Sequence, residues 1–153
     1  MIEDWTNRET WALATNLVND GQKFPMMKRK AEAAWGDQSS ANSLAEKSRQ
    51  AEVELAHVIE NYFLNESLVE ERSFAVDLII AALARVNFRE VAAHVLELSV
   101  DGFVNHKKLI DEALECINNC QLDFVEGVKY LVKLAEEQEA DLAILINGVI
   151  EGM

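Results

Sequence analysis

The chain has 153 residues, and its 27 acidic side chains outnumber its 14 Lys and Arg residues, which gives a formal net charge of −13. This balance argues against direct binding of nucleic acid, because a phosphate-binding surface needs clustered Lys and Arg. Half of the residues are apolar, with one Pro and six Gly, so the composition excludes a disordered or collagen-like chain. Two cysteines, no basic-apolar leader and apolar runs too short for a bilayer predict a cytoplasmic protein without membrane contact.

A capping box opens the first predicted helix. Thr6 and Glu9 have the spacing at which a hydroxyl and a carboxylate each satisfy a backbone donor at a helix start. Apolar periodicity carries this helix to about Val18. The only proline, Pro25, fits the first turn of a second helix, where its missing N–H breaks no helical bond, and Gly36 ends that helix.

The third predicted helix is long, with apolar residues spaced mostly three and four apart from Leu44 to Phe63. Ser67 and Glu70 then repeat the capping pattern and open a fourth helix, which continues to Val86. Because apolar residues occupy nearly its whole circumference, this fourth helix is predicted to be the central buried one.

Two more capping patterns lie in the second half of the chain, Asn87 with Glu90 and Asp123 with Glu126. The remaining predicted helices cover about residues 87–97, 104–117, 123–135 and 142–150. The sequence therefore predicts an all-α fold, a compact bundle of about eight helices. Residues 1–97 are predicted to form one helical module, with the acidic part 98–153 packed on it.

Two pairs of residues have spacings found in metal sites. Glu54 and His57 form the Glu-x-x-His pair by which one helix of a di-iron bundle offers two ligands, and Glu90 and His94 share one helix face. A di-iron site needs a second Glu-x-x-His pair, which the sequence lacks. A metal-dependent enzyme using these four residues is therefore kept as a lesser alternative, beside a simpler interpretation as partly exposed histidines near solvated glutamates.

The remaining candidates for chemistry are weaker. Cys116 and Cys120 are four apart and could supply half of a zinc site, but no further Cys and no His pair at finger spacing accompany them. Semi-buried packing cysteines are the preferred interpretation, and His106 is predicted to lie at the surface. Without a phosphate-binding glycine loop, a nucleophile elbow or a metalloprotease motif, we predict no enzyme activity, cofactor or metal.

Two blocks resemble a group of small proteins carried on phages, plasmids and integrative elements. The first is Trp-Thr-Asn-Arg-Glu-Thr-Trp at residues 5–11, followed by Asn19-Asp20, and the second is residues 82–94. The resemblance covers roughly residues 5–97 and implies a genetic context rather than a chemistry. It marks eight family positions: Trp5, Thr6, Asn7, Glu9, Trp11, Asn87, Glu90 and His94.

Acidic residues are denser in the second part of the chain. Residues 98–153 contain 11 acids and four bases, whereas residues 1–97 contain 16 and 10. An acidic face beside an apolar stripe suits contact with a basic partner protein, although the same charge could be merely solubilising. The candidate partner-binding residues are Asp111, Glu112, Glu115, Glu136, Glu137, Glu139 and Asp141, with Trp5 and Trp11 as candidate aromatic anchors.

The resemblance and the charge together predict an anti-CRISPR or related anti-defence inhibitor. It would bind a host protein or ribonucleoprotein complex with a basic surface, such as a CRISPR-Cas effector or nuclease, without catalysis. The alternative is a helical accessory or assembly protein of the mobile element that acts as a homodimer. The candidate dimer residues are Leu142, Leu145, Ile146 and Val149.

Overall fold

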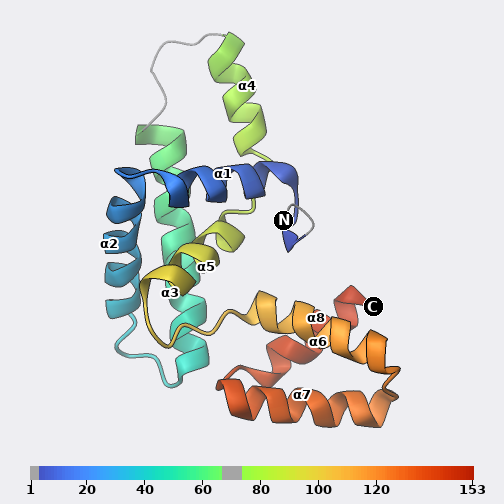
Figure 1. The fold of residues 1–153 in the computed structure, drawn as a ribbon. Coiled ribbons are helices and arrows are strands. Elements are labelled where there is room, and N and C mark those ends of the chain that lie inside the picture. Colours follow the sequence, from blue (N-terminus) through green and yellow to red (C-terminus); the bar gives the residue numbers. More distant parts are fainter. Residues whose placement is uncertain (1–3, 67–73) are drawn as a thin grey trace. The chain divides into compact units, whose positions relative to one another are not determined.

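The computed structural model describes residues 4–66 and 74–153, and this part of the chain is α-helical without strands (Figure 1). The prediction of an all-α fold with about eight helices is confirmed for these residues. None of the described helices is long and apolar enough to cross a membrane. The helices are α1 (Arg8–Asn19), α2 (Lys23–Gly36), α3 (Leu44–Asn61) with its π-helical continuation η2 (Tyr62–Glu66), α4 (Phe74–Leu83), α5 (Phe88–Ser99), α6 (His106–Cys120), α7 (Phe124–Gln138) and α8 (Leu142–Gly152).

The helix starts follow local capping rules, with one correction. Asp123 and Glu126 form the complete capping box predicted for α7. The N-cap of α1, however, is Asn7 and not Thr6, since the Asn7 side chain accepts a hydrogen bond from the Thr10 N–H at 2.9 Å. The Thr6 hydroxyl instead donates to a carboxylate on α5. Both side chains are chemically able to cap, and the tertiary partner of Thr6 decides between them.

The chain divides into two compact units. Unit 1 comprises Met1–Ser39 and Arg49–Asp101, and unit 2 comprises Ser40–Ser48 and Gly102–Met153. The sequence placed residues 40–48 in the N-terminal module, but Leu44 packs against the core of unit 2. The Val104 N–H also donates to the Ser48 hydroxyl at 2.8 Å. Helix α3 therefore belongs to unit 2 through its first turn and to unit 1 through the rest.

Helix α5 is the most buried element of unit 1. It packs against α1 and α2, which also contact each other. An ion pair of 3.3 Å between Arg89 and Glu52 joins α5 to α3. The fully buried large side chains of this unit come from four helices: Leu17, Met27, Leu55, Ile59, Val91, Val95 and Leu96.

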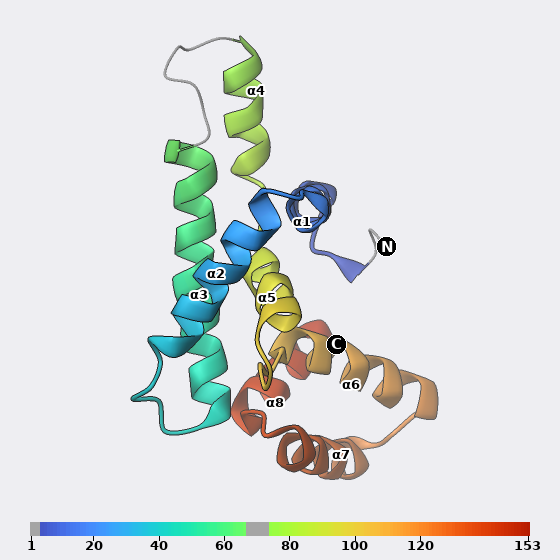
Figure 2. The ribbon, with the colours of Figure 1, turned by 60° about the vertical axis from the view of Figure 1, so that its left-hand side comes forward.

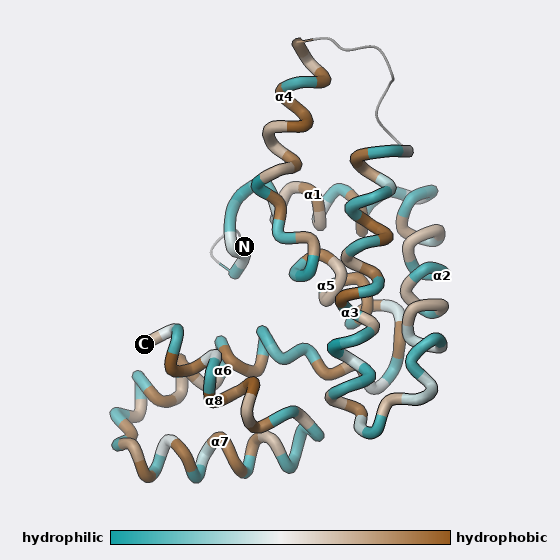
Figure 3. Tube along the Cα trace, turned by 180° about the vertical axis from the view of Figure 1, so that it is seen from behind, coloured by the Kyte–Doolittle hydropathy of each residue, from teal (hydrophilic) through white to brown (hydrophobic). Residues whose placement is uncertain are grey.

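The prediction that the fourth helix is central and buried is wrong. In α4 the side chain of Phe74 is 80% exposed, Leu78 and Ile79 are about half exposed, and Leu83 is buried. Figure 3 shows the hydrophobic residues that run along α4. An apolar composition all round a helix favours burial but does not determine which elements pack against it. In this protein α5, and not α4, is the buried helix of unit 1. The capping residues predicted for this helix, Ser67 and Glu70, lie outside the described residues.

The core of unit 2 forms where α8 packs against both α6 and α7 (Figure 2). Leu145 is fully buried and Val149 nearly so, while Leu142 and Ile146 are half-buried against the same core. Leu145 and Val149 therefore cannot contact a second copy while unit 2 is folded. This corrects the predicted dimer surface, whereas dimerisation itself stays a prediction. The buried members of the core are Val104, Leu109, Ala113, Ile117, Leu131, Ala135, Leu145 and Val149.

Gly148 allows α8 to approach α6 closely. A Cβ placed at this glycine would lie 2.8 Å from Cγ1 of Ile110 and closer still to its Cδ1. Overpacking a core commonly costs about 1–3 kcal/mol, against about 1 kcal/mol that alanine gains over glycine in a helix. We therefore expect Gly148→Ala to lower the free energy of unfolding by about 1 kcal/mol in urea titrations. Gly36→Ala, where no atom lies within 4 Å of the added Cβ, is the matched control and should not destabilise the protein.

Candidate functional site

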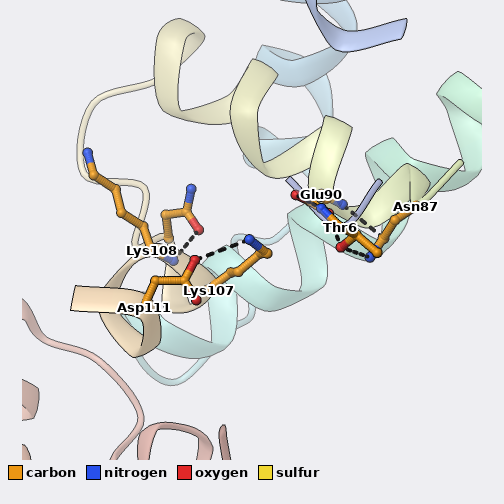
Figure 4. A network of polar contacts seen from close by, with 7 residues as sticks. Thr6, Asn87, Glu90, Lys107, Lys108 and Asp111 are labelled. Carbon is orange, nitrogen blue, oxygen red and sulfur yellow. Dashed lines mark hydrogen bonds and ion pairs between the residues drawn. The ribbon is translucent and has the colours of Figure 1, made fainter. Parts of the chain in front are cut away.

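A hydrogen-bonded cluster joins the segment before α1 to the start of α5. The Thr6 backbone N–H donates to both carboxylate oxygens of Glu90, at 3.0 and 3.3 Å, and its hydroxyl donates to Glu90 Oε2 (Figure 4). Glu90 is only 7% exposed. A buried carboxylate needs such donors, because removing it from water is otherwise costly. We call this cluster, with the Asn7, Thr10 and Asn87 contacts described next, the N-terminal clasp.

Asn7, Thr10 and Asn87 extend the clasp. The Thr10 hydroxyl donates to Asn7 Oδ1 at 2.8 Å and accepts a hydrogen bond from the Asn87 N–H at 2.9 Å. Asn87 is the N-cap of α5, where its side chain accepts from the Glu90 N–H, as the sequence predicts. In a complete capping box the Glu90 carboxylate would accept a hydrogen bond from the Asn87 N–H. Here the Glu90 carboxylate accepts from Thr6, and the Asn87 N–H donates to Thr10 instead.

Two further contacts link the same segments. Glu9 and Arg85 form an ion pair of 3.4 Å. The rings of Trp5 and His94 meet edge to face, with centroids 5.2 Å apart. Burial lowers the pKa of His94, although the nearby Glu97 opposes this shift. Seven of the eight positions marked by the resemblance therefore join residues 5–11 to residues 82–94 through a hydrogen bond, an ion pair or a ring contact, which explains their residue types structurally. The eighth, Trp11, is half-buried.

Three of the four residues considered for a metal site, Glu54, Glu90 and His94, each contact a different neighbour. Glu54 accepts a hydrogen bond from the Gln38 side chain at 2.7 Å, and burial together with the neighbouring Asp37 raises its pKa. Glu90 is bound by Thr6, and His94 lies against Trp5. Over residues 4–66 and 74–153, no three His, Cys, Asp or Glu side chains are grouped so that they could hold a metal ion.

An open pocket of about 310 Å³ lies beside His57 in unit 1. Half of its eight lining residues are apolar, and Arg89, another lining residue, is paired with Glu52. Burial raises the pKa of Glu52, and the Arg89 charge opposes that shift. The lining shows no nucleophile paired with a base, so the pocket suggests no reaction. Its lining residues are Val53, Ala56, His57, Glu60, Val86, Asn87, Phe88 and Arg89.

The acidic candidates of unit 2 fall into two groups. Asp111, Glu112 and Glu115 on α6 and Glu136 and Glu137 on α7 are all exposed. Asp111 pairs with Lys107 at 3.2 Å (Figure 4) and Glu137 with Lys133 at 3.8 Å. Exposed pairs of this kind contribute little stability, so the charges remain available to a partner.

The other two acids have local structural roles. Asp141 is half-buried and caps α8, because its side chain accepts from the Ala143 and Ile144 N–H groups. Glu139 ends α7 in the left-handed conformation, with φ of 53°. The Glu139 side chain is nevertheless exposed like the five acids above, so only Asp141 is a poorer candidate for partner contact.

The prediction of semi-buried cysteines holds for Cys116 and is wrong for Cys120. Cys116 is half-buried and Cys120 exposed, and a hydrogen bond with Cys116 raises the pKa of Cys120. The prediction that His106 lies at the surface is wrong, since it is 5% exposed. Its Nε2 accepts a hydrogen bond from the Asp141 N–H at 3.1 Å, which ties the start of α6 to the start of α8.

The sequence analysis did not predict that residues 5–11 contact residues 82–94. The available signal was an excess of capping residues: Thr6 and Asn7 stand side by side where one N-cap suffices, and Glu90 follows Asn87 at capping distance. Comparison of the chain with protein-family models, curated proteins and solved structures finds no match. The function therefore has to be inferred from the surfaces of this chain.

Proposed function

We propose that the protein is a non-catalytic inhibitor of host defence, of the anti-CRISPR kind. It binds a basic surface of a nucleic-acid-handling complex through the acidic side of unit 2. The observation that carries this proposal is an exposed row of Asp111, Glu112 and Glu115 on α6, which we call the α6 acidic row. The resemblance of residues 5–97 to proteins of mobile elements supplies the biological setting.

The α6 acidic row faces away from the core because of helix periodicity. Leu109, Ala113 and Ile117 of α6 are buried in unit 2. Residues 111 and 115 fall on the opposite side of the helix and residue 112 at its flank, all three exposed. Three carboxylates within two turns create a concentrated negative potential. A channel that binds nucleic acid is lined by Lys and Arg, so such a row can compete with phosphates for it.

Electrostatic contact of this type has a recognisable dependence on salt. Exposed charges are screened over about 8–10 Å at physiological ionic strength, so salt should weaken the complex mainly by slowing association. A purely solubilising surface would lack a partner whose binding depends on these three positions.

The test is phage plating on bacterial strains with active CRISPR-Cas immunity, one strain for each major effector type. We expect the wild-type protein to restore plating by at least about tenfold in one strain, and the triple variant Asp111→Lys, Glu112→Lys, Glu115→Lys to lose this effect. The matched control reverses three exposed acids of unit 1, Asp4, Glu32 and Asp101. It changes the net charge equally and should retain inhibition.

Two outcomes would contradict the proposal. If no strain gains plating from the wild-type protein, the anti-CRISPR assignment is wrong. If both triple variants inhibit as well as the wild type, the protein inhibits by another surface. Circular dichroism of each variant verifies that the helices are intact.

A further inference from the structure

The exposed side of α4 carries an apolar stripe. Phe74, Leu78 and Ala82 are four residues apart and all exposed, so they follow one another along the same side of the helix. The opposite side carries Val76, Ile80 and Leu83, of which Leu83 is buried and the others are half-buried. We call Phe74, Leu78 and Ala82 the α4 stripe.

A helix of this length and composition needs cover on its exposed side. Isolated helices shorter than about 12 residues are marginal in water, and helices that are apolar all round are normally buried. Helix α4 has ten residues, and it packs against η2 on one side of unit 1. The α4 stripe therefore has the character of an interface.

We propose that the α4 stripe binds the same stripe of a second copy of this chain. Two copies of α4 packed antiparallel about a two-fold axis at Leu78 place Phe74 of each helix opposite Ala82 of the other. A large side chain then meets a small one at both ends, and Leu78 meets its own copy at the centre. Such self-complementarity is what a two-fold interface requires.

The low charge of α4 favours this occupant, and the small exposed area makes the contact a weak one. Asp77 is the only charged residue in 74–84, so the stripe suits a nearly neutral surface like its own better than a basic one. The exposed parts of Phe74, Leu78 and Ile79 amount to roughly 400 Å² per copy, about half the area of a standard stable interface. An interface of this size lies at the small, transient end of known interfaces, so we expect a weak dimer that forms only at high protein concentration.

Sedimentation velocity of the full chain tests the dimer. Between about 1 and 200 μM we expect the wild type to shift from monomer to dimer, and Phe74→Asp to stay monomeric, because it would place a charge in the apolar interface. The matched control is Phe124→Asp on α7, since Phe124 is 83% exposed and Phe74 80%. A monomeric wild type, or a Phe74→Asp variant that dimerises like the control, would overturn the proposal.

Cross-linking tests the two-fold geometry independently of charge. In a Cys116→Ser, Cys120→Ser background, Leu78→Cys places the new thiol beside its own copy, and mild oxidation should give a disulfide-linked dimer. Ile150→Cys in the same background is the control, since Ile150 is exposed on α8. Equal cross-linking of the two variants would contradict pairing through α4. The α6 acidic row takes no part in this interface, so its triple Lys variant should still dimerise.

Discussion

Replacing Leu145 by aspartate is expected to unfold unit 2. Leu145 is fully buried between α6, α7 and α8, where truncation of a leucine typically costs about 2–5 kcal/mol. A carboxylate left at this position without a partner adds several kcal/mol more. The sum is comparable to the whole stability of a small domain, about 5–15 kcal/mol. We therefore expect the dispersed NMR resonances of residues 102–153 to be lost.

Ile150→Asp on the same helix is the control, because the Ile150 side chain is 62% exposed. This variant should keep its spectrum and unfold within about 0.5 kcal/mol of the wild type. The comparison also separates two interpretations of α8. If Leu145 served a dimer surface and not the core, Leu145→Asp would give a folded monomer, and our assignment of α8 to the core of unit 2 would be wrong.

Removing the Glu90 carboxylate is expected to loosen the N-terminal clasp. Hydrogen bonds to a charged group contribute about 1.5–3 kcal/mol, and Glu90 accepts from both the N–H and the hydroxyl of Thr6. We expect Glu90→Ala to lower the free energy of unfolding by about 2–3 kcal/mol in urea titrations. Glu97→Ala, at an exposed position of the same helix, should change it by less than about 0.5 kcal/mol.

A double-mutant cycle identifies the Thr6 contact as the cause. Thr6→Val removes the hydroxyl and keeps the backbone donor, so alone it should cost about 1 kcal/mol. In the Glu90→Ala background the same change should have almost no effect, because the acceptor is gone. Additive losses would show that Glu90 stabilises the protein through other contacts. Direct bonding of Thr6 to Glu90 would then be rejected.

The α6 acidic row and the α4 stripe differ in whether their exposure could be predicted from the sequence. The exposure of the α6 acidic row follows from its spacing against Leu109, Ala113 and Ile117, a relation visible in the residues alone. The exposure of the α4 stripe does not follow in this way. Its composition predicted burial, and only the packing of α5 against α1 and α2 shows that another helix fills the core of unit 1.

Local information determined the helices of this protein. Capping residues such as Asn87 and Asp123, and apolar residues three and four apart, act within one or two turns, so they can be recognised without a partner. Tertiary structure alone decided which polar and apolar groups meet.

In the folded chain the Thr6 hydroxyl donates to Glu90, the imidazole of His106 accepts from the Asp141 N–H, and Leu145 lies in the core of unit 2. The first pair lies 84 positions apart in the chain and the second 35. Capping and periodicity relate residues within a few positions of each other, so they carry no information about which distant segments will meet. The helices of this protein could therefore be predicted from its sequence, whereas the contacts of Thr6, His106 and Leu145 required the packed chain.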